Sequence, residues 1–112
     1  MTTGERTQRW LSDLRVFGDQ AAYIAEQGRE AYLEDSPHGA LLRNAGERIL
    51  IKVATVVERL PDEIKAAHPD IEWTKIMRMR NLVARHYDHV DGDLVWAALT
   101  NRIPDLVERL GA

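Results

Sequence analysis

The chain has 112 residues, of which 45% are hydrophobic and 29% are charged, and it contains no cysteine. This composition is typical of a globular domain and excludes a disordered or collagen-like chain, while the lack of cysteine excludes disulfides, thiol catalysis and thiolate metal sites. Fifteen Lys and Arg against 18 Asp and Glu give a net charge of -3, so the overall charge does not indicate a nucleic-acid binder. The sequence has neither a signal-peptide pattern nor an apolar run long enough to span a membrane, so we expect a cytoplasmic location and no membrane partner.

The first half of the chain predicts two long helices. From Glu5 to about Gln27, apolar residues recur at steps of three and four, and Gly28 interrupts the pattern. The sequence Asp35-Ser36-Pro37 predicts the start of a second helix, because a capping residue precedes proline. We expect this helix to run to about Leu60 and to bury one stripe of apolar side chains: Leu42, Ala45, Ile49, Val53, Val56 and Leu60.

The second half predicts a short turn and two more helices. The turn starts at Pro61 and ends near Pro69, and the third helix runs from Ile71 or Glu72 towards Tyr87. Asp91-Gly92-Asp93 precedes the last helix, whose cap we assign to the second aspartate, and Pro104 should kink or restart that helix. We therefore predict one all-α domain over residues 1–112, an up-down four-helix bundle with extra short helices. Its narrow apolar stripes leave apolar surface for a second subunit.

The third predicted helix carries the most informative residues. From Trp73 to Tyr87 it contains no acid and four cations, which are Lys75, Arg78, Arg80 and Arg85. At helical spacing Arg80 lies within about 40° of the centre of the apolar face, which ought to be buried, and a buried guanidinium needs a partner. That partner is either a phosphate or an acid such as Glu47 or Asp91, unless Arg80 extends from the edge of the core towards water. Arg78 and Arg85 point to the opposite side, with Lys75 nearby, as a solvated face or as an RNA-binding surface.

Two histidines follow at the end of this helix. His86 and His89 lie near Asp88, Asp91 and Asp93, a grouping that superficially resembles a metal site. Thiolates and a clear third ligand are missing, and turn and capping preferences explain the Asp-Gly-Asp sequence better. The sequence therefore predicts no metal site.

A family resemblance rests on the string Met79-Arg80-Asn81-Leu82-Val83-Ala84-Arg85-His86-Tyr87, followed by Asp91 and Trp96. The string resembles the HepT-like group of the HEPN superfamily, which are small, all-helical ribonuclease toxins. The resemblance covers roughly residues 40 to 110. It implies a homodimer in which the motifs of both chains line a cleft and cut RNA, with tRNA as one candidate, without a metal or another cofactor. It also implies a minimal nucleotidyltransferase antitoxin as partner.

The chain departs from the family motif at one position. The motif is Arg, four residues, His, one residue, then Tyr; aligned on Arg80, Asn81 and Tyr87, this chain has Arg85 where the histidine belongs. Imidazole exchanges a proton near neutral pH and guanidinium does not, so the resemblance implies a weakened or inactive ribonuclease, either by nature or through a replacement made for expression. His86 fits only a looser spacing, and on a straight helix it points about 120° away from Arg80. The helix must therefore break near His86, or the partner subunit must contribute.

The resemblance also assigns roles to residues around Arg85. Catalysis falls on Arg80, on Arg85 at the histidine position and on His86, with Asn81 and Asp91 in support. Tyr87 corresponds to the tyrosine that accepts AMP groups from the antitoxin, and each AMP places negative charge and bulk where RNA phosphate would bind. Two other hypotheses remain: a non-catalytic HEPN dimer that is the partner or substrate of a nucleotidyltransferase, and a helical interaction module unrelated to RNA.

Overall fold

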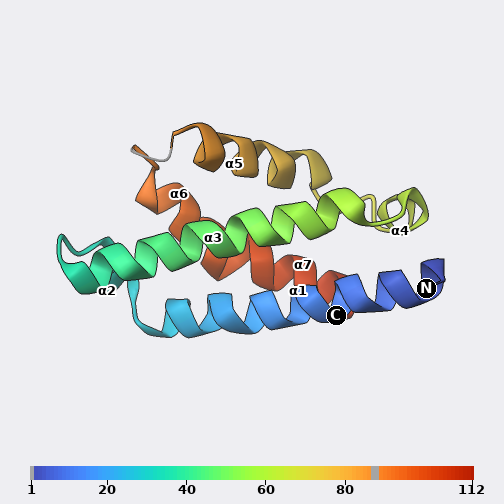
Figure 1. Cartoon of the computed structure of the whole chain (residues 1–112), viewed down its shortest axis with the longest axis horizontal. Coiled ribbons are helices and arrows are strands. Elements are labelled where there is room, and N and C mark those ends of the chain that lie inside the picture. The colour runs from blue at the N-terminus through green and yellow to red at the C-terminus, as the bar shows by residue number, and fades with distance from the viewer. Residues whose placement is uncertain (1, 87–88) are drawn as a thin grey trace.

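The fold is all-α in the part of the chain that the structure, a computed structural model, describes: residues 2–86 and 89–112. This result confirms the predicted fold class. Four long helical segments carry the bundle, and two short helices, α2 and α4, join them (Figure 1). The elements in chain order are α1 (Thr3–Glu26), α2 (Arg29–Leu33), α3 (Pro37–Arg59), α4 (Asp62–Ala67), α5 (Trp73–Arg85), α6 (Gly92–Ala97), the π-helical turn η1 (Ala98–Arg102) and α7 (Ile103–Leu110).

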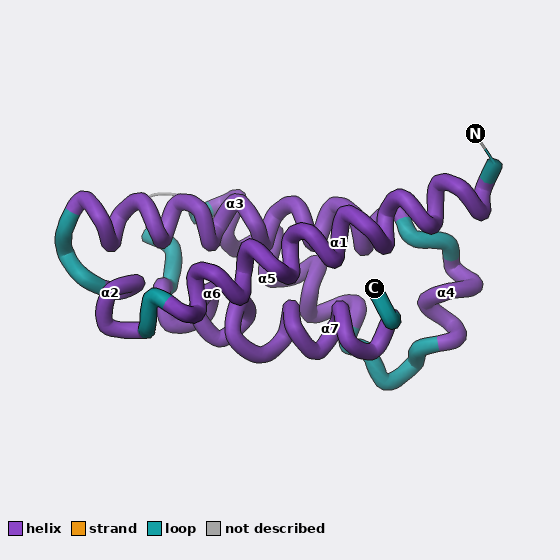
Figure 2. The backbone as a smooth tube through the Cα atoms, turned by 90° about the horizontal axis from the view of Figure 1, so that it is seen from below, coloured by secondary structure: helices purple, strands orange, loops and turns teal. Residues whose placement is uncertain are grey.

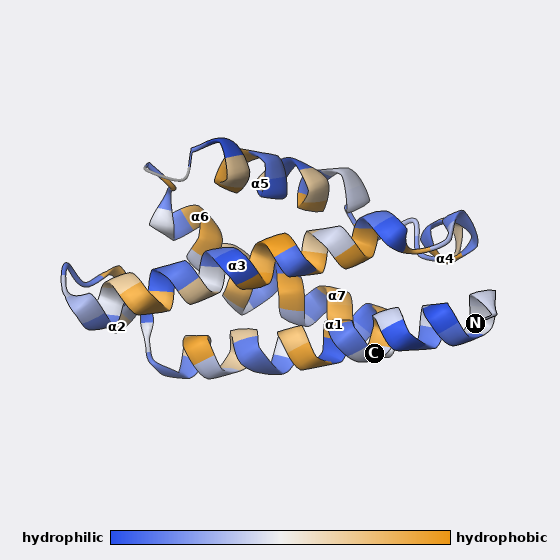
Figure 3. Ribbon diagram, viewed as in Figure 1, coloured by the Kyte–Doolittle hydropathy of each residue, from blue (hydrophilic) through white to orange (hydrophobic). Residues whose placement is uncertain are grey.

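Helix α3 lies in the middle of the bundle. It packs against α1 on one side and α5 on the other, while η1 and α7 pack against α1 (Figure 1). The long helices follow the longest axis of a body that measures 45 × 26 × 25 Å (Figure 2). Along each long helix polar residues alternate with apolar ones at helical spacing, as expected where one face is buried (Figure 3). This arrangement places α5 on the outside of the bundle, attached through one face to α3.

The ends of the two longest helices follow their capping residues. The hydroxyl of Thr2 accepts a hydrogen bond from the backbone N–H of Glu5 at 3.1 Å, and α1 begins at the next residue. Ser36 caps α3 in the same way by accepting from the N–H of Gly39 at 3.0 Å, directly before Pro37. The predicted start of the second helix is therefore confirmed. Between the two helices Gly28 has φ of 88°, a backbone conformation that favours glycine, and ends the first helical run.

An aromatic pair fills the core between α2, α3 and α6. Tyr32 is fully buried, and its ring centroid lies 5.2 Å from that of Trp96. A Cβ atom at Gly46 would lie 2.8 Å from the Tyr32 hydroxyl oxygen and 2.7 Å from Leu99 Cδ1, so only glycine leaves room for these side chains. This packing corrects the predicted stripe at Ala45, which is exposed because Gly46 takes the core-facing position beside it.

The last helix is divided in two, as Pro104 predicts. Proline has no N–H to donate, and the helix widens into the π-helical turn Ala98–Arg102 directly before α7 begins. The predicted cap was wrong by two residues. The carboxylate of Asp91, not that of Asp93, caps α6, by accepting hydrogen bonds from the N–H groups of Asp93 at 3.0 Å and Leu94 at 3.3 Å. The reason is that Gly92 already belongs to the helix, so the capping position precedes it.

Candidate functional site

Helix α5 carries most of the predicted site residues, and all of these except Arg80 are exposed. Ile76, Met79 and Val83 are buried against the core, as their spacing predicts. The helix begins at Trp73 and ends at Arg85, so it is shorter than the predicted segment at both ends. The residues on its other faces are exposed: Arg78, Asn81, Leu82, Ala84 and Arg85. One face of α5 thus fixes the helix to α3, and the remainder is open to a ligand or to another protein.

Arg80 lies at the boundary between these two faces. Its side chain is 22% exposed, and its Nη1 donates a hydrogen bond to Oε2 of Glu58 on α3 at 2.7 Å. The same hydrogen bond, reinforced by the positive charge of Arg80, lowers the pKa of the Glu58 carboxyl below its ordinary value. The acids considered from the sequence, Glu47 and Asp91, are therefore not the partners of Arg80. Because 22 residues separate Glu58 from Arg80, only the antiparallel packing of α3 and α5 brings them together, and no local sequence signal identifies this pair.

A second carboxylate neutralises another cation of this region. Glu72, directly before α5, forms an ion pair with Lys75 and lies 3.7 Å from Arg102 of η1. The hydrogen bond from Lys75 is the main cause that lowers the pKa of Glu72. Four cations on α5 against the carboxylates of Glu58 and Glu72 leave a local charge of +2, less than the +4 of the helix sequence alone. This excess corresponds to Arg78 and Arg85.

Arg85 and His86 mark the point where the helix ends. Arg85 is the last helical residue and is exposed. His86 has φ of -117° and ψ of 44°, so the helical path stops there, while its N–H still bonds to the carbonyl oxygen of Leu82 at 3.1 Å. On a straight helix His86 would point away from Arg80, so the motif requires the helix to break near His86. The structure shows such a break. Tyr87, the predicted modification site, lies outside the described residues.

A shallow hollow of about 260 Å³ lies beside this end of α5. We call it the α5-end hollow. Its walls are mostly apolar, and two imidazoles border it, those of His86 and His89. The backbone N–H of His89 donates to the carbonyl oxygen of His86 at 2.9 Å, and this bond keeps the two residues together at the rim. The lining residues are Leu82, Val83, His86, His89, Val90, Asp91 and Leu94.

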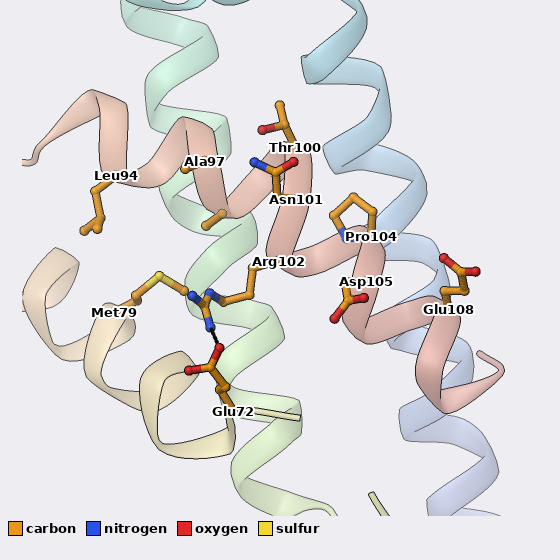
Figure 4. Close-up of a pocket in the computed structure, with 11 residues that line it drawn as sticks. Glu72, Met79, Leu94, Ala97, Thr100, Asn101, Arg102, Pro104, Asp105 and Glu108 are labelled. Carbon is orange, nitrogen blue, oxygen red and sulfur yellow. Dashed lines mark ion pairs between the residues drawn. The ribbon is translucent and has the colours of Figure 1, made fainter. Parts of the chain in front are cut away.

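A larger hollow of about 620 Å³ lies on another flank of α5, between α5 and the segment from α6 to α7. In Figure 4 Arg102 extends from η1 towards Glu72, and Met79 approaches the same space from α5. None of Arg80, Asn81, Arg85 and His86 lines it. We therefore place the candidate site at the exposed face and C-terminal end of α5 and not in this larger hollow.

Among residues 2–86 and 89–112, no three His, Asp or Glu side chains lie together in a way that could hold a metal ion. No helix in these two ranges combines the length and the apolarity needed to cross a membrane.

Comparisons with known proteins give a consistent result. A family model described as "Ribonuclease HepT-like" matches residues 17–112. "Probable ribonuclease HepT" of Thermococcus cleftensis is 30% identical over 83 residues, which cover 74% of this chain and 76% of that protein. "Putative RNase TTE0752" of Caldanaerobacter subterraneus subsp. tengcongensis is 24% identical over 91 residues, 81% of each chain. No solved structure matches the chain significantly.

Proposed function

The chain belongs to the Ribonuclease HepT-like family, and on this premise we propose that it is a toxin of a toxin-antitoxin pair that descends from metal-independent RNA endonucleases. In this proposal two copies form a homodimer, and the exposed faces of their α5 helices line the cleft that binds RNA. The substrate is RNA with accessible single-stranded segments, for which tRNA is one candidate.

The observation that carries the proposal is the position of Arg80. Glu58 holds its guanidinium at the edge of the exposed face of α5, one residue before the exposed Asn81 and five residues before Arg85. A guanidinium has five N–H donors, and Glu58 is bonded to Nη1, so other donors of Arg80 remain for an RNA phosphate. Arg78 extends the positive charge along the same helix for binding the RNA backbone, and Lys75, although paired with Glu72, lies beside it as a further candidate contact.

The chemistry requires a group that Arg80 cannot supply. Attack of a ribose 2′-hydroxyl on the adjacent phosphate needs a base that takes the hydroxyl proton near neutral pH. The bond from phosphorus to the 5′-oxygen of the next nucleotide breaks, that oxygen takes up a proton, and a 2′,3′-cyclic phosphate remains. The family histidine would act as this base, but position 85 is arginine, which binds phosphate and does not accept a proton. His86 is the nearest imidazole, at the helix break. We propose that the chain is inactive or weakened for this reason, with Arg80, Arg85 and His86 as the residues that would contact the reacting phosphate.

Regulation would act on the residue that follows His86. We propose that a cognate minimal nucleotidyltransferase antitoxin transfers AMP to the hydroxyl of Tyr87. The added phosphodiester places negative charge next to Arg85 and His86 and competes with RNA phosphate for the same cations. Incubation with the antitoxin and ATP should add mass in AMP units to a peptide that contains Tyr87, and modification elsewhere would count against this role.

The test of the function is an RNA-cleavage assay on the chain and on its Arg85→His variant, each with a chelator present. We expect cleavage with cyclic-phosphate ends to appear or rise in the histidine variant. Arg85→Lys is the matched control, because lysine keeps the charge but holds its proton at neutral pH. If the folded, dimeric histidine variant neither cuts RNA nor slows cell growth, the ribonuclease proposal is wrong.

One observation favours a second function. An exposed arginine stands where the family motif has its base, which suits a protein that has kept the bundle and lost the reaction. In that case the dimer serves only as a partner or substrate of the nucleotidyltransferase. Modification by the antitoxin without any cleavage by the Arg85→His variant would support this alternative.

A further inference from the structure

A second positively charged feature lies away from the exposed face of α5, between the first turns of α1 and the last turns of α3. It is a hollow of about 330 Å³, which we call the arginine hollow. Among the residues that the structure describes, its lining comes from these two helices: Arg6, Arg9, Trp10 and Asp13 of α1, and Val56 and Arg59 of α3. Three arginines against one aspartate give it a charge of +2, although the whole chain carries -3.

The three guanidiniums are available to a ligand. Arg6, Arg9 and Arg59 are exposed, and none forms a side-chain ion pair or hydrogen bond with residues 2–86 or 89–112. By contrast, Arg29 at the start of α2 pairs with Asp93, and Arg109 at the end of α7 pairs with Asp105. Free guanidinium groups present several N–H donors in a planar arrangement that matches phosphate oxygens. The hollow is therefore suited to an anion with more than one phosphate.

Trp10 adds a surface for an aromatic ligand. Its side chain is half-buried and packs against the hydrophobic core, so the ring is held in place while part of it borders the hollow. Nucleobases stack on such rings irrespective of sequence. A fixed indole among free arginines is typical of surfaces that bind single-stranded nucleic acid, and an acidic peptide would make no comparable use of the ring.

The arginine hollow is connected to the candidate site through two consecutive residues. Glu58 of α3 holds Arg80 at 2.7 Å, and Arg59 lines the hollow. These two residues belong to the last turn of α3. Helix α5 packs on α3 from one side and α1 from the other (Figure 1). A single strand bound at both places would pass around this turn of α3.

We propose that the arginine hollow is a second RNA-binding subsite, in which Trp10 stacks on one unpaired base and Arg6, Arg9 and Arg59 bind the flanking phosphates. This inference rests on the proposed function, since it concerns the same RNA. It adds the requirement that the substrate has a single-stranded segment beyond the nucleotides held at α5. An RNA too short to span both subsites binds as it would to α5 alone.

The test measures binding of a fluorescently labelled single-stranded RNA to the full chain by anisotropy at several salt concentrations. The variant Arg6→Ala/Arg9→Ala removes two exposed cations from the hollow, and Arg15→Ala/Arg48→Ala removes two exposed cations elsewhere as the matched control. Loss of two phosphate contacts should make the slope of log K against log salt less steep by about 1.4. If the variant and the parent bind equally at 1 M salt, the variant should therefore bind about 25-fold more weakly than the parent at 0.1 M salt. Trp10→Leu, which keeps an apolar side chain against the core, should weaken binding about 5-fold or more.

The outcomes separate this inference from the proposed function. If the Arg6→Ala/Arg9→Ala variant binds RNA with the same affinity and salt slope as the control variant, the inference is wrong. It is also wrong if that variant binds RNA normally but fails to dimerise or to bind its antitoxin, since the hollow would then contact protein. Weakened RNA binding by the Arg6→Ala/Arg9→Ala variant supports the inference even if the Arg85→His variant cuts no RNA. A failure of Arg85→His to cut RNA contradicts only the proposed cleavage. A chain that binds no RNA at all removes both.

Discussion

Replacing Asp91 tests whether this residue supports the candidate site through structure or through chemistry. Its carboxylate accepts two backbone hydrogen bonds at the start of α6, from Asp93 at 3.0 Å and Leu94 at 3.3 Å. Asp91→Ala leaves both N–H groups without this acceptor, which costs about 1 kcal/mol for a typical N-cap. For a chain of 112 residues we therefore expect the melting temperature to fall by about 4 °C.

The matched variant is Asp91→Asn, because asparagine caps helices about as well as aspartate and carries no charge. Thermal unfolding followed by circular dichroism should show a clear loss for alanine and almost none for asparagine. In the Arg85→His background, RNA cleavage should follow the same order, since Asp91 acts by fixing the start of α6. An asparagine variant that is as stable as the parent but loses as much cleavage as the alanine variant would refute this reasoning and indicate that the charge itself is required.

Three further predictions concern the ion pair and the core. Above the ordinary pKa of a glutamate carboxyl, the chain should be more stable than its Glu58→Gln variant, because Glu58 is ionised and pairs with Arg80. Thermal melts should show this difference disappear as the pH falls through the lowered pKa of Glu58, because protonation ends the ion pair. The buried hydroxyl of Tyr32 has no hydrogen-bond partner among the described residues. Urea unfolding of Tyr32→Phe should therefore show unchanged stability or a gain of up to about 1 kcal/mol, and a clear loss would contradict this reasoning. Gly46→Ala should lose about 1–2 kcal/mol by overpacking. Gly4→Ala, where a Cβ would meet nothing nearer than 4.0 Å, should lose nothing in the same measurement.

The sequence was sufficient for most of the helices because their signals are local. Ser36 before Pro37 predicts the start of α3, and Pro104 predicts the division of the last helix. Ala45 was assigned to the core because helical spacing alone cannot tell it from Gly46. What decides between them is the tyrosine of another helix, Tyr32, which needs a position without a Cβ.

The electrostatics of the site depended on contacts that are distant in sequence. The spacing of α5 places Arg80 on the apolar face and indicates that this arginine needs a partner, whereas in the structure it lies at the edge of that face and pairs with Glu58. The sequence does not identify Glu58 as this partner, because the two residues lie on different helices, 22 positions apart, and helical spacing relates only residues of the same helix. The arginine hollow was missed for the same reason: Arg6 and Arg9 come close to Arg59 only because α1 packs on the end of α3.

The structure also determines how informative the exchange at position 85 is. Arg85 is the last residue of α5 and is exposed, and it makes no side-chain ion pair with any residue in the described ranges. Replacing it by histidine therefore removes no buried contact, while Arg80 remains bonded to Glu58 on α3. Surface changes of this kind usually alter stability by no more than about 0.5 kcal/mol. A gain of cleavage in Arg85→His would thus report proton transfer by the new imidazole and not a repaired fold.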